Sequence, residues 1–285
     1  MRKSRETRPE MTRVQGSGFR VKAIELIPEA AILHHREQDG SFWGTRGRWI
    51  LHGRPGSRWE QVARFPFASP RDYFGFARAS ARAMRADKCN LYLNKAGCLL
   101  GIRAGQAFRL NPKNKLERLF HIQGDSVLHG GITEDREGWV YFGEYFMNPG
   151  RETVAIWRLA PDLQSWEEAH RFEAGTIRHV HGVYRDPYDA EALWAPVGDY
   201  DGECFFYLTR DRFKSVERIG DGGQLWRAVR LFFTPDHVCW LTDSQIEENT
   251  ACRMDRRTGE IEVGQVIEAP SWYGARTQEG LYIAF

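Results

Sequence analysis

Long apolar runs are missing from this chain of 285 residues. No stretch approaches the ~20 consecutive apolar residues that a membrane-spanning helix needs, so we expect no membrane partner. The N-terminus, MRKSRETRPEMTRVQGSG, is basic but has no apolar core of the kind found in secretory signals. We therefore expect a cytoplasmic protein in which residues 1–17 form a disordered basic tail.

Cysteines are few and show no paired spacing. Five occur, at Cys89, Cys98, Cys204, Cys239 and Cys252, and no two of them form a C-x-x-C pair. An odd number without close pairs argues against a disulfide framework and against a zinc ribbon. We expect buried free thiols in a reducing compartment.

An excess of one charge is also absent, since 40 basic side chains stand against 38 acidic ones. A dedicated nucleic-acid binder usually carries a clear basic excess, so we expect no nucleic-acid partner. The sequence contains no H-E-x-x-H, G-x-S-x-G, Walker or dinucleotide-binding motif. These absences argue against the common protease, lipase, NTPase and dehydrogenase classes.

The sequence does contain a β-hairpin pattern that recurs six times. In each instance two strand-like runs flank a short turn, and the second run is rich in aromatic and aliphatic residues. The six hairpins occupy residues 35–45, 93–102, 132–144, 184–199, 233–243 and 275–285. Their turn residues, which are Gly40, Gly97, Gly138, Ala190, Asp236 and Gly280, lie about 48 residues apart on average, close to the ~40–50 residues of a propeller blade.

Two further strand-like runs follow several of these hairpins, for example 153–160 and 165–173. Four strands per unit without helices between them are typical of a propeller blade. The pattern predicts an all-β fold, a single β-propeller over residues 18–285 with about six four-stranded blades (five to seven are compatible). Residues 18–27 could close the ring as an outer strand; alternatively, the chain is cut from a longer protein.

One segment interrupts the repeat. Residues 69–88 are rich in helix-forming residues with amphipathic spacing, which predicts one helical insertion near residues 70–86. Its arginines are either solvated on a surface helix or placed in a basic flap that borders an anionic ligand.

Equivalent positions of the repeat should meet at one mouth of the central channel. The position after the second strand carries Arg46, Arg103, Glu144, Asp199 and Asp243 in successive units, and Tyr145 and Tyr200 adjoin two of these. The start of the first strand carries His129, His181 and Arg227, with His179, Gln224 and Trp226 close by. Each residue taken singly could instead have a structural role, such as binding turn amides.

These residue types suit carbohydrate chemistry. Glu144, Asp199 and Asp243 are candidates for the acid, base or nucleophile of a glycosidase, while His129, His181 and Tyr145 are alternative bases for a lyase. Arg46, Arg103 and Arg227 would hold an anionic group, and Trp226, Gln224 and Tyr200 would contact the rest of the substrate. His179 and His181 could ligate a divalent metal, completed by His129 or Asp199; no other cofactor is expected.

Three segments resemble the sialidase-like group of β-propellers, which carry BNR or Asp-box repeats. Segment RHVHGVYRDPYDAEALWAPVGDYDGE (178–203) is similar to the H-x-H-x-x-x-x-D-P … W-x-x-x-G-D stretch of that group, and segments 128–145 and 222–244 extend the similarity. The nearest counterparts of an Asp-box are residues 160–166 and 209–217. The resemblance implies a propeller fold and points to glycan substrates.

The sequence therefore leads to the hypothesis of a carbohydrate-active enzyme, a glycoside hydrolase or polysaccharide lyase. It would act on an acidic or polar oligosaccharide or polysaccharide at the channel mouth. The alternative is a non-catalytic propeller that binds a glycan or protein partner, since one fold serves many functions.

Overall fold

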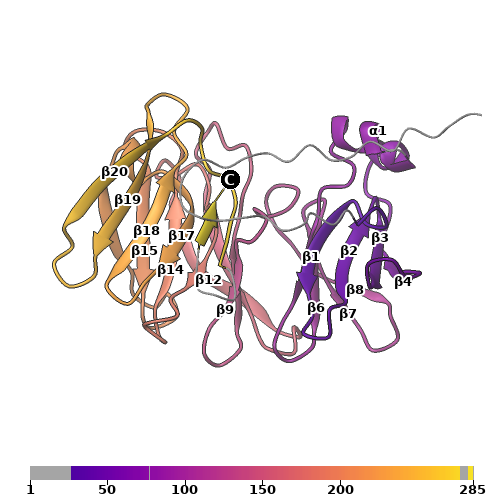
Figure 1. Ribbon diagram of the computed structural model, residues 1–285. Helices are drawn as coiled ribbons and strands as arrows, with labels where there is room; N and C mark the ends of the chain where they lie inside the picture. The colour runs from indigo at the N-terminus through magenta and orange to yellow at the C-terminus, as the bar shows by residue number, and fades with distance from the viewer. Residues whose placement is uncertain (1–26, 77, 277–281, 285) are drawn as a thin grey trace, which may run out of the picture.

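The computed structural model describes residues 27–76, 78–276 and 282–284. Within these ranges the chain forms five four-stranded antiparallel sheets and one two-stranded sheet, each with its strands in sequence order. The sheets follow one another along the chain (Figure 1). This series of four-stranded meanders is a β-propeller.

Each unit of the propeller is a run of consecutive strands. Blade 1 consists of β1 (Ile32–Arg36), β2 (Phe42–Arg46), β3 (Trp49–Gly53) and β4 (Glu60–Arg64), and blade 2 of β5 (Asn90–Leu93), β6 (Leu99–Arg103), β7 (Gln106–Leu110) and β8 (Leu116–His121). Blade 3 consists of β9 (Ile132–Glu134), β10 (Val140–Gly143), β11 (Val154–Leu159) and β12 (Trp166–Phe172), and blade 4 of β13 (Tyr184–Arg185), β14 (Leu193–Val197), β15 (Cys204–Thr209) and β16 (Glu217–Gly222). Blade 5 consists of β17 (Ala228–Phe233), β18 (His237–Thr242), β19 (Asn249–Asp255) and β20 (Ile261–Ile267), and a sixth unit of β21 (Gly274–Arg276) and β22 (Tyr282–Ala284).

The six hairpins expected from the sequence are all antiparallel strand pairs. Gly40, Gly97 and Gly138 turn three of them with φ of 86°, 78° and 89°, a left-handed conformation that glycine adopts at little cost. The Asp135 carboxylate supports one of these turns by accepting a 2.9 Å hydrogen bond from the Trp139 amide. The residues at these turns therefore produce the recurring hairpin pattern that is visible in the sequence.

The apolar core is divided among the interfaces between successive blades. Separate clusters of buried side chains join blades 1 and 2, 2 and 3, 3 and 4, and 4 and 5. Between blades 4 and 5 the rings of Trp226 and Trp240 stack 5.5 Å apart, and Phe206 packs edge-on against both. The outer strand β20 is almost wholly exposed, whereas inner strands of neighbouring blades pack together, as β1 does with β5.

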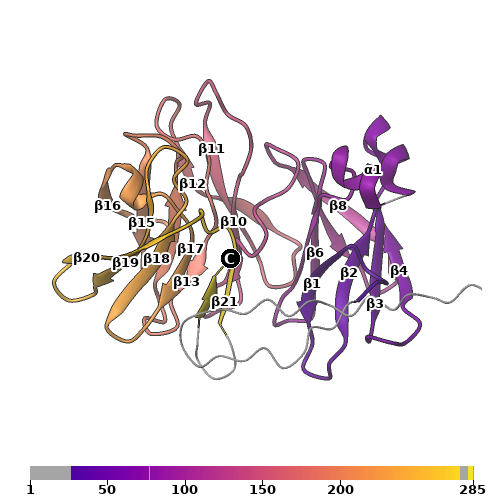
Figure 2. The same cartoon turned by 45° about the horizontal axis from the view of Figure 1, so that its top comes forward.

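The predicted helical insertion is present but shorter than expected. It consists of a 3-10 helix, η1 (Pro70–Phe76), followed by α1 (Arg78–Ala83), so regular helix ends before residue 86. The α1 segment lies at the end of the first two blades (Figure 2). Arg71 donates two 2.7 Å hydrogen bonds to Asp125, and the side chain of Asp72 pairs with the buried Arg103. These ion pairs fix the insertion to blade 2 and the loop that follows it.

The sixth unit is the hairpin β21–β22, which lies between β17 and β1 in both views (Figures 1 and 2). The predicted closing strand at 18–27 falls almost entirely on residues 1–26, outside the described residues, as does the predicted tail at 1–17. Cys89, Cys204 and Cys252 are buried free thiols. No helix in the described part of the chain has both the length and the apolar character to cross a membrane.

Candidate functional site

A cavity of about 1460 Å³ is lined by side chains from two positions that recur from blade to blade. One position precedes an inner strand and contributes Lys88, His129, Arg227 and Trp272 to the wall. The other follows the strand paired with it and contributes Tyr145, Asp199 and Asp243. Ile32 of blade 1 also reaches the wall, so the cavity draws on all six units.

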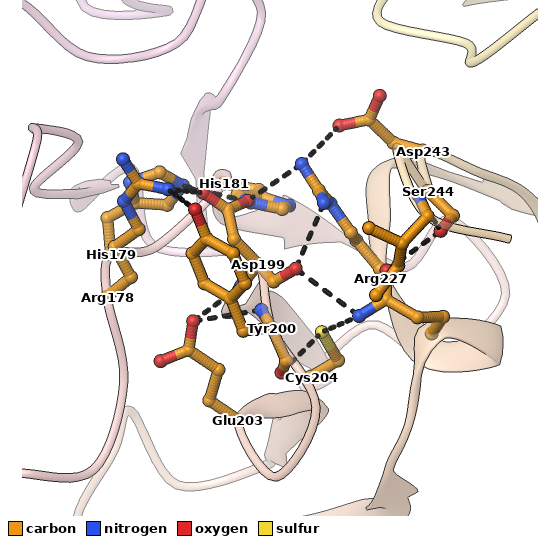
Figure 3. Close-up of polar contacts among 12 residues, drawn as sticks. Arg178, His179, His181, Asp199, Tyr200, Glu203, Cys204, Arg227, Asp243 and Ser244 are labelled. Carbon is orange, nitrogen blue, oxygen red and sulfur yellow. Dashed lines mark hydrogen bonds and ion pairs between the residues drawn. The ribbon is translucent and has the colours of Figure 1, made fainter. Parts of the chain in front are cut away.

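Asp199 lies at the centre of a polar cluster beside this cavity (Figure 3). Its Oδ2 accepts from Arg178 Nη1 at 3.0 Å, and its Oδ1 lies 3.3 Å from Nη2 of Arg227. Nε2 of His179 lies 3.3 Å from Oδ2, and Nε2 of His181 lies 3.2 Å from Oδ1. Burial alone would raise the pKa of Asp199, but hydrogen bonds from Nε2 of His179 and His181 outweigh it while those rings carry a proton there, and the pKa is then lowered.

The conformation of the loop that holds Asp199 is fixed by Gly198 and by the side chains of Glu203 and Arg151. Gly198 has φ of 82°, and a Cβ atom there would lie 2.0 Å from the carbonyl oxygen of Glu203. The Glu203 carboxylate accepts from the amides of Asp199 and Tyr200 at 3.0 and 2.9 Å. Arg151 in turn donates to Glu203 at 2.7 Å. This closed loop fixes where the Asp199 side chain points.

Arg227 connects Asp199 to a second carboxylate, Asp243. Nη1 of Arg227 donates to the backbone oxygen of Asp199 at 3.0 Å, and its Nη2 lies 3.6 Å from Oδ2 of Asp243. Burial raises the pKa of Asp243, although Arg227 and a hydrogen bond from Trp272 lower it in part. The two carboxyl groups beside one arginine thus have pKa values shifted in opposite directions.

The two histidines of the H-x-H pair are held by backbone carbonyls. Nδ1 of His179 lies 3.0 Å from the oxygen of Phe146, and Nδ1 of His181 lies 2.7 Å from the oxygen of Ala228. Their Nε2 atoms lie 3.1 Å apart. Both rings are buried, and both point toward Asp199 (Figure 3). The ring of Tyr145 lies 4.2 Å from that of His179.

Aromatic side chains surround the mouth of the cavity. Tyr200, Trp272 and Tyr273 line it and are 49%, 52% and 40% exposed. The His129 ring lies 6.3 Å from that of Tyr273 and 5.6 Å from that of His34 in blade 1. The cavity wall therefore combines exposed aromatic rings with charged side chains.

The structure places several predicted site residues away from the cavity. Arg46 is exposed and donates to the backbone oxygen of Pro28. Arg103 is buried against Asp72 and the Ala86 carbonyl. The Glu144 carboxylate accepts from the amides of Gln123 and Ala155 and from the Trp157 indole, at 2.9 to 3.1 Å.

Two other predicted residues lie just behind the cluster. Trp226 packs in the core against Trp240. Gln224 is buried and donates to the Asp199 backbone oxygen at 3.3 Å, while its own side-chain oxygen accepts from Ser244 at 2.9 Å. Neither residue lines the cavity: Gln224 supports the loop of Asp199, and Trp226 belongs to the core between blades 4 and 5.

Sequence reasoning missed several residues of the wall. They are Arg178, Lys88, Arg230, Trp272 and Tyr273. Lys88 stands just before β5, and Trp272 and Tyr273 stand just before β21. Lys88, Trp272 and Tyr273 could have been predicted from the sequence, because they occupy the same position of the repeat as His129 in unit 3 and Arg227 in unit 5.

Comparison with known proteins identifies the fold. No protein-family model matches the chain, and no curated protein matches it. Among solved structures, an ancestral GH74 enzyme gives a TM-score of 0.56 at 9% identity, covering 88% of this chain and 34% of that chain. A structure of the mitotic checkpoint complex gives 0.52 at 11% identity, covering 98% and 93%. A gluconolactonase from Xanthomonas campestris gives 0.49 at 12% identity, covering 89% and 82%. At these identities the two structures with TM-scores above 0.5 show a shared β-propeller fold and nothing more.

Proposed function

We propose that the chain is an enzyme that hydrolyses an anionic carbohydrate in the 1460 Å³ cavity. The observation that carries this proposal is the pair Asp199 and Asp243, held by one arginine with oppositely shifted pKa values. Most glycosidases use two catalytic carboxyl groups with different pKa values, one as the acid and the other in its charged form.

Asp243 is suited to be the general acid, because burial favours its protonated form. Asp199 is suited to be the charged member of the pair, because its pKa is lowered. One oxygen of each lies within 3.6 Å of the same Arg227 nitrogen, so these oxygens are at most about 7 Å apart. That limit is compatible with the ~5–5.5 Å typical of retaining glycosidases and with the lower end of the ~6.5–9.5 Å range of inverting ones.

The charge of the cavity wall favours an anionic substrate. The wall carries five cationic side chains, Arg85, Lys88, Arg178, Arg227 and Arg230, against the three carboxylates Asp125, Asp199 and Asp243. Nε of Arg178, Arg227 and Arg230 is buried without a hydrogen-bond partner among the described residues. Guanidinium groups bind carboxylate and sulfate in bidentate geometry, which supports a uronic or sialic acid unit in the substrate.

The exposed rings of Tyr200, Trp272 and Tyr273 support a sugar as the body of that substrate. Binding sites combine apolar and aromatic walls with a few placed polar groups, and a sugar ring presents both kinds of surface. A sialidase-type reaction, suggested by the sequence resemblance, is one reaction on such a substrate.

The proposal is tested by mass spectrometry of products after incubating the protein with uronate-containing, sialate-containing and neutral oligosaccharides. We expect cleavage of an anionic substrate with gain of one water, and Asp243→Asn should lower kcat by ~10²–10⁴-fold. The matched control is Asp236→Asn, an exposed aspartate in the β17–β18 hairpin, which should keep full activity.

Other outcomes would replace the proposal. An unsaturated product without gain of water would identify a lyase instead. Binding of anionic glycans without turnover, unchanged by Asp243→Asn, would favour the non-catalytic scaffold.

A further inference from the structure

The hydrogen bonds of His179 and His181 determine where each neutral ring carries its proton. A backbone carbonyl only accepts, so the contacts of Nδ1 with Phe146 and Ala228, at 3.0 and 2.7 Å, require a proton on both Nδ1 atoms. In the neutral rings Nε2 then carries a lone pair. Metal-binding histidines are commonly oriented in this way, with the other ring nitrogen donating to a carbonyl.

These two lone pairs face each other and the Asp199 carboxylate. Nε2 of His179 lies 3.1 Å from Nε2 of His181, and the two atoms lie 3.3 and 3.2 Å from the carboxylate oxygens. Donor atoms that share one ion at ~2.0–2.2 Å are themselves separated by about 3.0–3.6 Å. The two nitrogens have this spacing, each has it to a different oxygen of Asp199, and the ligand atoms of all three side chains lie within 4.8 Å of one another, as ligands around one metal ion would.

A single proton satisfies this arrangement less well than a metal ion does. If one ring became an imidazolium, its Nε2 proton could be directed at the other Nε2 or at Asp199, but the second neutral ring would still face the carboxylate with a lone pair. A cation at the centre attracts all three groups at once. No other set of three histidine, cysteine or acidic side chains in the described part of the chain brings its ligand atoms so close together.

The backbone around the three groups is fixed before any ion binds. The amide of Val180 donates to the oxygen of Glu144 at 3.0 Å, and that of His181 to the oxygen of Pro196 at 2.9 Å. The amide of Gly198 donates to the oxygen of His179 at 3.1 Å, which ties the H-x-H segment to the loop of Asp199. A site held in this way keeps its geometry without an ion.

Arg178 and Arg227 also contact Asp199, one at each oxygen. A carboxylate offers about four lone-pair positions, so each oxygen can accept from an arginine and still face a metal ion. With an ion present the cluster would hold a divalent cation and two guanidinium groups against one aspartate. Such a site attracts an anionic fourth ligand, and both His179 and Asp199 border the cavity from which that ligand would enter.

We propose that His179, His181 and Asp199 bind one divalent transition-metal ion of the zinc class. Two imidazole nitrogens and one carboxylate favour Zn²⁺ and its neighbours over Ca²⁺ or Mg²⁺, which prefer oxygen ligands alone. The site leaves one position open toward the cavity for the anionic group of the substrate. The metal site stands on the geometry above, whereas the identity of the fourth ligand rests on the proposed function.

The test is a calorimetric titration of the chelator-treated full-length chain with Zn²⁺ and, separately, with Ca²⁺. We expect one Zn²⁺ per chain and no comparable binding of Ca²⁺. The variant His181→Asn should bind Zn²⁺ at least about 100-fold more weakly, since loss of an outer partner alone costs 10–100-fold. The control is His237→Asn, at the start of β18 and outside the cavity wall, which should bind Zn²⁺ as the parent chain does.

A second measurement guards against a variant that fails to fold, since His181 is fully buried. The parent chain is loaded with one equivalent of Cu²⁺ and examined by electron paramagnetic resonance. We expect hyperfine coupling to two imidazole nitrogens. Absence of stoichiometric Zn²⁺ binding, or Cu²⁺ without imidazole coupling, would overturn the metal site.

The metal site and the proposed function can fail independently. If Zn²⁺ binds but no anionic oligosaccharide is turned over, the metal site stands and the proposed function is wrong. If an oligosaccharide is cleaved equally well after chelator treatment and Zn²⁺ does not bind, the function stands and the metal site is wrong.

Discussion

The indole Nε1 of Trp272 donates a 2.7 Å hydrogen bond to Oδ1 of Asp243. Trp272 stands just before β21 in the sixth unit, and Asp243 follows β18 in blade 5. The bond therefore links two neighbouring units at the cavity. A donor to a carboxylate favours its charged form, so Trp272 lowers the pKa of Asp243 while burial, the larger effect, raises it.

Replacing Trp272 with phenylalanine removes that donor and should raise the pKa of Asp243 further. If Asp243 is the general acid, its protonated form then persists to higher pH. We expect the alkaline limb of the profile of kcat/KM against pH to move upward in Trp272→Phe, whereas Trp49→Phe, in blade 1 and outside the cavity wall, should not move it. A downward shift, or none, would contradict the role of Asp243.

The ion pair of Arg103 with Asp72 should be important for stability and not for substrate binding. Both side chains are at most 2% exposed, and removing one partner of a buried pair costs about 3–5 kcal/mol. We expect Arg103→Met to lower the free energy of unfolding in urea by that amount. Arg253→Met breaks an exposed pair with Glu262 and should cost no more than about 1 kcal/mol. If folded Arg103→Met bound the substrate more weakly than the parent chain, Arg103 would contribute to substrate binding and this prediction would be wrong.

His34 should make the protein less stable in acid. Its Nδ1 accepts from the Leu91 amide at 3.3 Å, and its Nε2 lies 2.9 Å from the Thr45 hydroxyl. Burial, assisted by His129, lowers the pKa of His34 from 6.5 to about 3. Between these values the unfolded chain binds a proton that the folded chain does not. Stability is therefore lost as pH falls from about 6.5 toward 3, by at most ~1.4 kcal/mol per pH unit from this one group.

The check for His34 is urea unfolding of the parent chain and of His34→Asn between pH 7.5 and 4.5. The asparagine oxygen can still accept from Leu91, but it does not titrate. The difference in unfolding free energy between the two proteins should shrink as the pH is lowered. A difference that stays constant over this range would show that His34 is not responsible.

Gly198 should tolerate no side chain, because the loop of Asp199 depends on it. A Cβ atom would lie 2.0 Å from the oxygen of Glu203, in a residue whose φ is already 82°. Gly202 in the same loop has φ of 88°, but a Cβ atom added there would meet nothing within 4 Å, so it serves as the matched control. We expect Gly202→Ala to cost about 1 kcal/mol through φ alone, and Gly198→Ala to cost clearly more in urea unfolding. Equal losses would show that the loop relaxes around the added methyl group.

Much of the fold could be predicted from the sequence, because hairpin turns depend on local chemistry. Gly40, Gly97 and Gly138 marked three hairpins that the structure contains, each with positive φ. The length of the insertion was not predictable in the same way. Asp72 lies within η1 and is held by Arg103, 31 residues further along the chain, and such a contact leaves no periodic signal in the sequence.

The candidate site was predictable only where its residues occupy matching positions of the repeat. Matching repeat positions brought Asp199, Arg227 and Asp243 together as the sequence suggested they would meet. Glu144 occupies the same position in blade 3, yet its carboxylate binds the amides of neighbouring segments. Which of these equivalent side chains faces the cavity depends on the adjoining segments, and the repeat alone does not specify that.

The route by which the cavity is assembled has a consequence for synthesis. Its wall runs from Ile32 to Ala275, with His34 beside His129 and His129 beside Tyr273. Each blade can form from neighbouring strands as it leaves the ribosome, but the wall is complete only after the segment with Trp272 has emerged. A nascent chain that stops after blade 5 would be largely folded and yet lack one side of the cavity. Ligand binding would therefore report that translation has reached the sixth unit.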